Sequence, residues 1–467
     1  MLTTRPDTGP TPSLLDPLPG TLLTVSRPWP GVSLLDFLHA GAGRPRVYWE
    51  NENRPLALAG YGRAAVLTAR GADRFHHLQT QIDRLFRHIL PLQPDTPPEI
   101  GPKLFGGFSF FWGEPRTPAW EPFPEAWFLL PRLQLTRSGD QTWLTLNHIL
   151  QPGEDPAATA ARLIERARDI CWQGLDSRFA AAILDNGAPP LSKGQHETLM
   201  SRDAWIEMVT RARARIRRGA LDKVVLARGL RLRFPQPLDV LTALARLQAR
   251  YPDCYRFLIE PRPGHAFFGA TPELLAETRA RELRTAALAG SIRRGHTWQE
   301  DQALGQQLLD SPKDRHEHDL VVREILHNLQ PLVSRLEAPA TPQLCLLNNI
   351  QHLKTPITAR LSDGQGILAL IHALHPTPAL GGFPRPSALR LIRQLEPLPR
   401  GWYGAPVGWL APGREGLFAV AIRSAVTNPG QALLYAGAGI VADSDPEKEW
   451  RETELKFQPV LHALGCV

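Results

Sequence analysis

The chain has 467 residues, of which 43% are hydrophobic and 21% are charged, as in an ordinary globular protein. Its 53 basic side chains exceed its 46 acidic ones, but the two signs are interspersed and no zinc-finger spacing or basic-aromatic interleaving occurs, which argues against nucleic-acid binding. The absence of a long apolar run, of a signal-peptide core and of paired C-x-x-C cysteines predicts a cytoplasmic protein without a membrane segment.

The first part of the chain is rich in predicted strands. Residues 1–20 contain many Pro, Thr and Gly residues and predict a flexible N-terminal arm. Short segments of β-branched and aromatic residues follow and are typical of strands. They occupy residues 46–69, 105–113 and 126–149, with a turn at Ser138-Gly139-Asp140. We therefore expect a strand-rich N-terminal subdomain over residues 21–190.

Two further features end this part of the chain. Residues 155–171 have helical periodicity, and the Pro/Gly-rich stretch 185–197 predicts a linker. The remainder, residues 195–465, interleaves helices and strands. Its first predicted helix begins after Ser201 and carries an apolar stripe formed by Trp205, Met208, Val209, Ala212 and Ile216. The strand "LDKVVLARGLRLRF" follows, and the whole pattern indicates a mixed α/β or α+β enzyme with large sheets.

Acidic residues are concentrated near the C-terminus, where residues 443–454 hold six acids and two bases. Asp445 followed by Pro446 is a helix start, and acids in a first turn are favoured by the helix dipole. A solvated helix start, an acidic interaction patch and a cation site are all compatible with this stretch. Glu449, Glu452 and Lys456 lie close to one helix face, although the last two could form a simple surface pair.

A second group of acids stands at a predicted helix that begins near Ser311 and Pro312. Glu317 falls in line with the apolar stripe of that helix, where a carboxylate is costly unless it is paired or holds a cation. His316 and His318 point to nearly opposite sides of the helix and cannot chelate one metal together. Because the available donors are carboxylates, Mg²⁺ is the cation that fits best.

Seven motifs in this order resemble those of the chorismate-utilising enzymes, and among these they are most similar to the isochorismate synthases. They are "KVVLAR", "FFGATPELLAE", "TAALAGSIRRG", "SPKDRHEHDLVV", "LHPTPALGGFP", "AIRSA" and "YAGAGIVADSDPEKEWRETELK". The resemblance implies one compact unit of two large packed antiparallel sheets surrounded by helices. It also implies an isomerase that adds water at C2 of chorismate while the C4 hydroxyl leaves, giving isochorismate.

The resemblance also assigns catalytic roles. Lys223 matches the general base, which must be neutral for part of the time, and Glu273 matches the general acid, which needs a raised pKa. Read from the residues alone, Lys223 is better explained as a strand-end lysine that reaches solvent, and Glu273 is equally a turn acid after Pro272.

Further positions match the family's metal and substrate sites. Glu317 and Glu452 match direct Mg²⁺ ligands, while Glu449 and Asp314 match partners that act through water. Asp314 departs from the family pattern, which has glutamate there. The expected substrate-binding residues are Gly290, Ser291, His352, Ala379, Leu380, Tyr403, Arg423, Gly437 and Lys456. Taken alone, His352 is equally a hydrogen-bonded structural histidine. Arg423 interrupts the apolar strand "LFAVAIRSAV", which disfavours its interpretation as a surface arginine.

Relatives with other activities differ in their motifs. The chain has "AGSIRRG" and lacks "LLES", which disfavours the ammonia-dependent anthranilate and aminodeoxychorismate synthases, so no glutaminase subunit is expected. Salicylate synthase makes isochorismate first and then expels pyruvate. The segment "HPTPAL" disfavours this activity, and that preference rests on resemblance alone. A basic binding protein without activity is the alternative from another class. The product could feed menaquinone or siderophore biosynthesis, and we expect a monomer or a weak homodimer.

Overall fold

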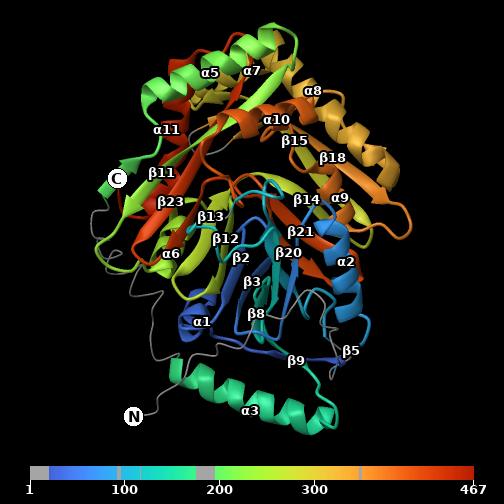
Figure 1. Ribbon diagram of the computed structural model, residues 1–467. Helices are drawn as coiled ribbons and strands as arrows, with labels where there is room; N and C mark the ends of the chain where they lie inside the picture. The colour runs from blue at the N-terminus through green and yellow to red at the C-terminus, as the bar shows by residue number, and fades with distance from the viewer. Residues whose placement is uncertain (1–19, 92–95, 116, 175–194, 347–349, 467) are drawn as a thin grey trace.

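The computed structural model describes residues 20–91, 96–115, 117–174, 195–346 and 350–466. Within these residues the chain forms two large sheets with helices packed on them (Figure 1). The helices are α1 (Leu34–Ala40), α2 (Arg74–Leu85), α3 (Pro156–Gly174), α5 (Arg202–Arg217), α6 (Val240–Arg250), α7 (Trp298–Asp310), α8 (Pro312–Leu329), α9 (Ile367–Leu374), α10 (Arg385–Leu395) and α11 (Pro446–Ala463). No helix in the described residues is long and apolar enough to cross a membrane.

The first sheet has thirteen strands in the order β10-β11-β23-β22-β13-β12-β2-β3-β8-β9-β1-β5, with β19 beside β11. Its neighbours are antiparallel except for β1 and β5. Its strands are β1 (Leu22–Pro28), β2 (Arg46–Glu50), β3 (Leu56–Tyr61), β5 (Ile89–Pro91), β8 (Leu133–Ser138), β9 (Gln141–Ile149), β10 (Gln195–Thr198), β11 (Lys223–Arg233), β12 (Tyr255–Arg262), β13 (His265–Thr271), β19 (Gly382–Phe383), β22 (Ser424–Asn428) and β23 (Gln431–Ile440).

The second sheet has ten antiparallel strands in the order β16-β18-β15-β14-β21-β20-β6-β7-β4, with β17 beside β18. Its strands are β4 (Ala65–Ala69), β6 (Leu104–Phe108), β7 (Ala126–Leu130), β14 (Leu274–Arg279), β15 (Glu282–Arg293), β16 (Val333–Glu337), β17 (Gln343–Leu346), β18 (Ile350–Leu361), β20 (Pro406–Ala411) and β21 (Glu415–Val420). The predicted fold class, two large antiparallel sheets with surrounding helices, is confirmed.

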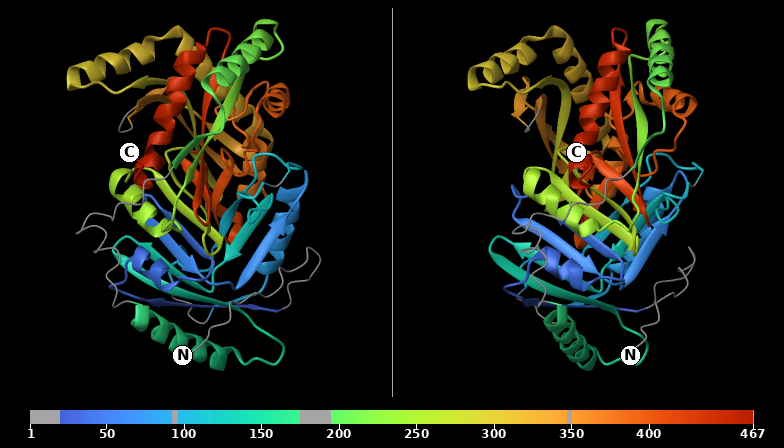
Figure 2. Two further views of the ribbon diagram at one scale, coloured as in Figure 1. Left: turned by 60° about the vertical axis from the view of Figure 1, so that its left-hand side comes forward. Right: turned by 90° about the vertical axis from the view of Figure 1, so that its left-hand side faces the viewer.

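Both parts of the chain contribute strands to both sheets. In the first sheet β2 pairs with β12, and in the second β6 pairs with β20. The views in Figure 2 show the early strands, in blue, continuing into the later strands, in yellow to red. Aromatic contacts cross the same junction, since Phe108 lies 6.3 Å from Phe418 and Phe123 lies 5.4 Å from Trp402 between ring centroids. The core is therefore shared between the two parts.

Local signals in the sequence explain several helix starts. Ser201 caps α5, whose predicted apolar stripe is buried, and Ser311 caps α8 with Pro312 in the first turn. Asp445 caps α11 by accepting hydrogen bonds from two backbone N–H groups of the first turn. The predicted turn between Ser138 and Gln141 joins β8 to β9.

Two sequence predictions, the linker at residues 185–197 and the N-terminal arm at residues 1–20, fall largely outside the described residues, and the described part of the linker is a strand. Of the predicted linker 185–197, residues 195–197 belong to strand β10, which pairs with β11, because Gln195–Thr198 extends the edge of the first sheet. The rest of that linker and nearly all of the predicted N-terminal arm lie outside the described residues.

Candidate active site

A cavity of about 280 Å³ opens where α8 packs on β15 and α11 packs on β23. All the site residues that the sequence predicts line this one cavity. They are Lys223, Glu273, Gly290, Ser291, Asp314, Glu317, His352, Ala379, Leu380, Tyr403, Arg423, Gly437, Glu449, Glu452 and Lys456. Residues far apart in the sequence are thus brought together by the two sheets and two helices.

Lys223 is the first residue of β11 and its side chain is largely buried. Its ammonium forms an ion pair with the Glu317 carboxylate, which α8 presents from the other side of the cavity. Gly439 on the neighbouring strand β23 makes room for the lysine, because a Cβ atom at this position would lie 3.0 Å from Lys223 Cε. The base predicted from sequence is therefore held inside the cavity and does not extend into solvent.

Glu273 lies between β13 and β14, directly after Pro272. Burial raises the pKa of its carboxyl group to about 7, although the nearby positive charges of Arg423, Lys456 and Lys223 act in the opposite direction. A carboxyl group with such a pKa is protonated for much of the time at neutral pH. Glu273 can therefore donate a proton, which an ordinary exposed glutamate cannot do efficiently.

Helix α11 supplies two acids to the cavity. Burial and the adjacent Glu452 charge raise the pKa of Glu449 to about 7. Glu452 accepts a hydrogen bond from Lys456 at 2.5 Å, and the same ammonium donates to the carbonyl oxygen of Gly437 at 2.9 Å. Lys456 thus connects the acids of α11 to the backbone of β23.

Helix α8 supplies the other two acids. The hydroxyl of the cap residue Ser311 donates to the Asp314 carboxylate and accepts from the Asp314 N–H at 3.3 Å. Asp314 therefore serves the helix start as well as facing the cavity. His318 is buried with Nε2 2.7 Å from the Thr355 hydroxyl, whereas His316 is exposed, as expected for residues two apart on a helix.

The four carboxylates offer oxygen donors that suit a hard cation. In the described ranges no three His, Cys, Asp or Glu side chains form a preassembled metal site, and Glu317 and Glu452 contact lysines. Burial, and after it the charge of Glu452, raise the pKa of Glu449, and a bound cation would offset both effects. This donor set fits Mg²⁺, which takes a few carboxylates and completes its shell with water and substrate oxygens.

Polar groups on β15 and β18 form another wall of the cavity. The Ser291 hydroxyl lies 2.7 Å from His352 Nδ1. Burial, together with the charges of Arg423 and Lys456, lowers the pKa of His352 to about 4, so the imidazole is neutral at pH 7. Gly290 has a φ of 74° at an irregularity of β15, and a Cβ there would lie 3.2 Å from Asp314 Cβ. Only glycine fits this close approach without strain.

Arg423 and Tyr403 provide donors on the remaining side. Burial raises the pKa of Tyr403 to about 12, so its hydroxyl remains a hydrogen-bond donor at neutral pH, and its ring stacks on Tyr435 with centroids 5.2 Å apart. A Cβ at Gly437 would lie 3.3 Å from this hydroxyl. Arg423 lines the cavity and has a φ of 51°, which is an uncommon backbone conformation for arginine.

Several lining residues were not predicted from the sequence, among them Lys313, Cys345 and Ser444. Lys313 and Ser444 stand inside motifs that carried predicted ligands, one position from Asp314 and in the turn before α11 respectively. Their position next to predicted ligands was the sequence signal that could have identified Lys313 and Ser444. Ser444 stabilises the turn, because its hydroxyl accepts from the Val441 N–H at 3.1 Å.

The cavity combines a buried lysine, a protonatable glutamate, four carboxylates for a cation and several cationic or neutral donors. Such an arrangement can bind a small substrate with more than one carboxylate, and it can supply a proton at one point while removing one at another.

Comparison with known proteins identifies relatives along nearly the whole chain. The family model described as chorismate binding enzyme matches residues 18–465. A Pseudomonas aeruginosa protein named salicylate biosynthesis isochorismate synthase is 40% identical over 424 residues, covering 91% of this chain and 85% of its own length. The isochorismate synthase MenF of Bacillus subtilis is 36% identical over 452 residues, covering 95% and 93%.

Solved structures give the same result at the level of the fold. The menaquinone-specific isochorismate synthase MenF of Escherichia coli superposes with a TM-score of 0.78 at 28% identity, covering 97% of each chain. Anthranilate synthase component I of Streptococcus pneumoniae shares the fold, with a TM-score of 0.71 at 19% identity, covering 88% of this chain and 93% of its own.

Proposed function

The chain belongs to the family of chorismate binding enzymes, and we propose that it converts chorismate to isochorismate with Mg²⁺ as its cofactor. Within the family it falls among the isochorismate synthases, the name carried by its relatives from Pseudomonas aeruginosa and Bacillus subtilis. The observation that carries the finer proposal is the presence of Lys223 and Glu273 in one cavity with four carboxylates.

The proposed reaction needs a base and an acid. Lys223, when neutral, takes a proton from the water that attacks C2 of chorismate. The ring double bonds shift, and Glu273 gives its proton to the C4 hydroxyl, which leaves as water. The pKa of about 7 at Glu273 supports the acid role, because a carboxyl group that is already ionised has no proton to give. In the reverse direction the two residues exchange roles.

Mg²⁺ would be held by Glu317 and Glu452, with Glu449 and Asp314 acting through water. The cation supplies positive charge that neutralises the ring carboxylate of the substrate. Glu317 is paired with Lys223 in this structure, so it has to exchange that ammonium for the cation. After this exchange the Lys223 amine would be available to meet water.

The second carboxylate of chorismate, on the enolpyruvyl group, needs its own donors. We assign these to Tyr403, Arg423 and Lys456, since a guanidinium and an ammonium form strong charge-assisted hydrogen bonds with carboxylates. Gly437 leaves the space beside Tyr403 open. Gly290, Ser291 and His352 would line the site of the ring carboxylate, and Ala379 and Leu380 the side of the ring.

The decisive experiment is product analysis after incubation of the protein with chorismate, with Mg²⁺ and with EDTA. Isochorismate as the only product, formed with Mg²⁺ and lost with EDTA, supports the proposal. Salicylate and pyruvate in equal amounts would show a salicylate synthase instead. Turnover that persists in EDTA would contradict the metal assignment, and no turnover together with salt-sensitive DNA binding would support a binding protein.

A further inference from the structure

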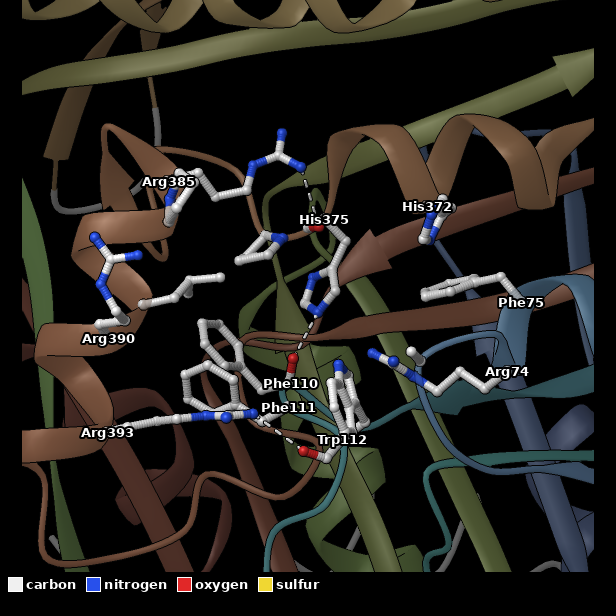
Figure 3. Close-up of a pocket in the computed structure, with 14 residues that line it drawn as sticks. Arg74, Phe75, Phe110, Phe111, Trp112, His372, His375, Arg385, Arg390 and Arg393 are labelled. Atoms are coloured by element: carbon white, nitrogen blue, oxygen red, sulfur yellow. Dashed lines mark hydrogen bonds between the residues drawn. The ribbon is translucent and has the colours of Figure 1, made fainter.

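A second cavity, of about 480 Å³, lies outside the candidate active site (Figure 3). It is enclosed by the start of α2, the loop after β6, the end of α9 and helix α10. None of the residues that line it also lines the active-site cavity. Its lining comes from residues 72–75 and 110–112 and from two neighbouring segments late in the chain, residues 372–376 and 385–393.

The lining of the second cavity is strongly cationic. It includes Arg74, Arg385, Arg390 and Arg393, and its described lining contains no aspartate or glutamate. Arg385 pairs with Glu324 at 3.4 Å, outside the lining, and donates to the Ala373 carbonyl at 2.9 Å. Arginines gathered around one hollow without a carboxylate among them repel each other unless an anion enters.

Arg74 is the clearest reason to expect a ligand in this cavity. The residue is only 4% exposed, and its Nε has no hydrogen-bond partner. The two terminal nitrogens reach only backbone carbonyls, those of Gly71 and Ser109, at 3.4 Å each. Within the described chain no carboxylate is at ion-pair distance from it. Burial lowers the pKa of Arg74 to about 10, which still leaves the guanidinium charged at neutral pH, desolvated and incompletely paired.

Aromatic rings form the rest of the cavity. Figure 3 shows Arg393 and Arg74 approaching from opposite sides, with Trp112 between them and Phe111 on the side of Arg393. The Arg393 guanidinium lies 4.5 Å from the ring centroid of Phe111 and 5.9 Å from that of Trp112, and its Nη2 donates to the Trp112 carbonyl at 3.1 Å. Trp112 is 48% exposed, which is unusual for a residue with a large apolar ring and leaves apolar surface available to a ligand.

We propose that this cavity is a binding site for a small aromatic carboxylate. The guanidinium of Arg74 would bind the carboxylate, and Arg393, Phe111 and Trp112 would pack against the ring and add positive charge beside it. An inorganic anion would satisfy the arginines but leave the aromatic walls and most of the volume unused. A volume of about 480 Å³ is in the range of cavities that bury ring-containing small molecules.

The site is connected to the active site through one segment of chain. His375 and Pro376 line the second cavity, and Ala379 and Leu380, a few residues on, line the first. His375 Nε2 lies 3.1 Å from the Phe110 carbonyl, which ties this segment to the loop after β6. A ligand in the second cavity would therefore contact the segment that forms one side of the proposed chorismate site.

Saturation-transfer NMR titration of the full protein with benzoate tests the proposal. We expect saturable binding that Arg74→Lys and Arg393→Gln each weaken about tenfold, the first through a weaker charge-assisted hydrogen bond and the second through lost stacking and positive charge. Cyclohexanecarboxylate, which lacks the aromatic ring, and benzyl alcohol, which lacks the charge, should both bind more weakly. Arg211→Gln, an exposed arginine outside the lining, serves as the matched control and should leave benzoate binding unchanged.

The variant Arg423→Gln separates the two cavities. Benzoate binding that survives this change but is weakened by Arg393→Gln supports the second cavity. Binding lost with Arg423→Gln and unaffected by Arg393→Gln would place benzoate in the active site and overturn the proposal. Inorganic phosphate binding as tightly as benzoate would overturn the aromatic class, and absence of saturable benzoate binding would overturn the site. If Arg74→Lys fails to fold, the exposed Arg393→Gln still decides the outcome.

Discussion

Lys223 and Glu317 form an ion pair that joins the first residue of β11 to the second turn of α8. Their side chains are only 10% and 25% exposed, so the pair is shielded from solvent. Burial alone would raise the pKa of Glu317, but the Lys223 ammonium outweighs it and leaves the pKa below its ordinary value. A carboxylate that is kept ionised in this way can bind a metal cation. If Glu317 released Lys223 on binding the cation, metal binding would free the proposed base for reaction.

Removing the lysine tests its role as base. We expect Lys223→Ala to lower kcat about 100- to 10,000-fold, the usual contribution of a general base, while the Kd for chorismate changes little. Steady-state kinetics and equilibrium binding measure the two quantities. Lys448→Ala, an exposed lysine on α11, is the control and should keep normal kcat. Near-normal turnover by Lys223→Ala would remove it from the reaction.

The metal ligands can be tested through stability as well as activity. Because Mg²⁺ binds the folded chain, it should raise the melting temperature, and Glu452→Gln should reduce that rise by weakening the site. Differential scanning calorimetry across a Mg²⁺ titration measures the effect without relying on turnover. Glu454→Gln, two residues further and outside the cavity lining, should respond to Mg²⁺ like the native protein. An identical titration for Glu452→Gln would exclude it as a ligand.

The raised pKa of Glu273 predicts a pH-dependent stability. The folded chain holds the Glu273 proton up to about pH 7, whereas the unfolded chain releases it near the ordinary value of 4.5. Stability that is present below 4.5 is therefore lost as the pH rises through about 7. Glutamine keeps the neutral form, so Glu273→Gln should gain stability relative to the native protein between pH 5 and 8, by up to about 3 kcal/mol.

Urea unfolding in Mg²⁺-free buffer at several pH values measures this difference. Glu454→Gln, which replaces an exposed acid on α11, provides the comparison and should show no such pH-dependent gain. If Glu273→Gln and the native protein keep a constant difference in unfolding free energy across this range, Glu273 is not a raised-pKa acid, and its role as proton donor would have to be given up.

Substitution of two glycines of β23 should affect chorismate binding and turnover separately. A methyl group at Gly439 would approach Lys223 Cε to 3.0 Å, so Gly439→Ala should displace the base and lower kcat. A methyl group at Gly437 would lie 3.0 Å from the Leu226 carbonyl oxygen, which the backbone holds in place, and 3.3 Å from the Tyr403 hydroxyl, so Gly437→Ala should displace Tyr403 and raise KM for chorismate. Steady-state kinetics of the two variants, each the control for the other, measures the split. Equal effects on both constants would argue against separate roles.

Local signals explain how much of the site could be predicted from the sequence. The helices that carry the acids, Pro312–Leu329 and Pro446–Ala463, begin at serine or aspartate caps followed by proline, as expected. Their spacing places Glu449 and Glu452 on one face without knowledge of the fold. The pairing of Lys223 with Glu317 could not be predicted in this way, because it depends on α8 packing against a distant strand. The residue roles remain predictions from resemblance.

The order of the strands was equally beyond local reasoning. Nothing in the segments around β2 and β12 indicates that they are neighbours, since cross-strand partners are set by non-local packing. The cationic second cavity was missed for the same reason. Arg74 and Arg393 stand in unrelated segments and line one cavity only because the start of α2, the loop after β6 and helix α10 surround it. Only the periodicity and caps of single elements are visible along the chain.

The shared sheets limit how this protein can be shortened or recombined. A fragment that began at β10 would keep every proposed catalytic residue but would lose the partners of β12 and β20. Each of these strands would then present unpaired N–H and C=O groups along a buried edge, which is the arrangement that leads chains to pair with each other and aggregate. The strands of the first part of the chain, which contribute no residue to the lining of the candidate active site, thus cover the strand edges along which the catalytic part would otherwise aggregate.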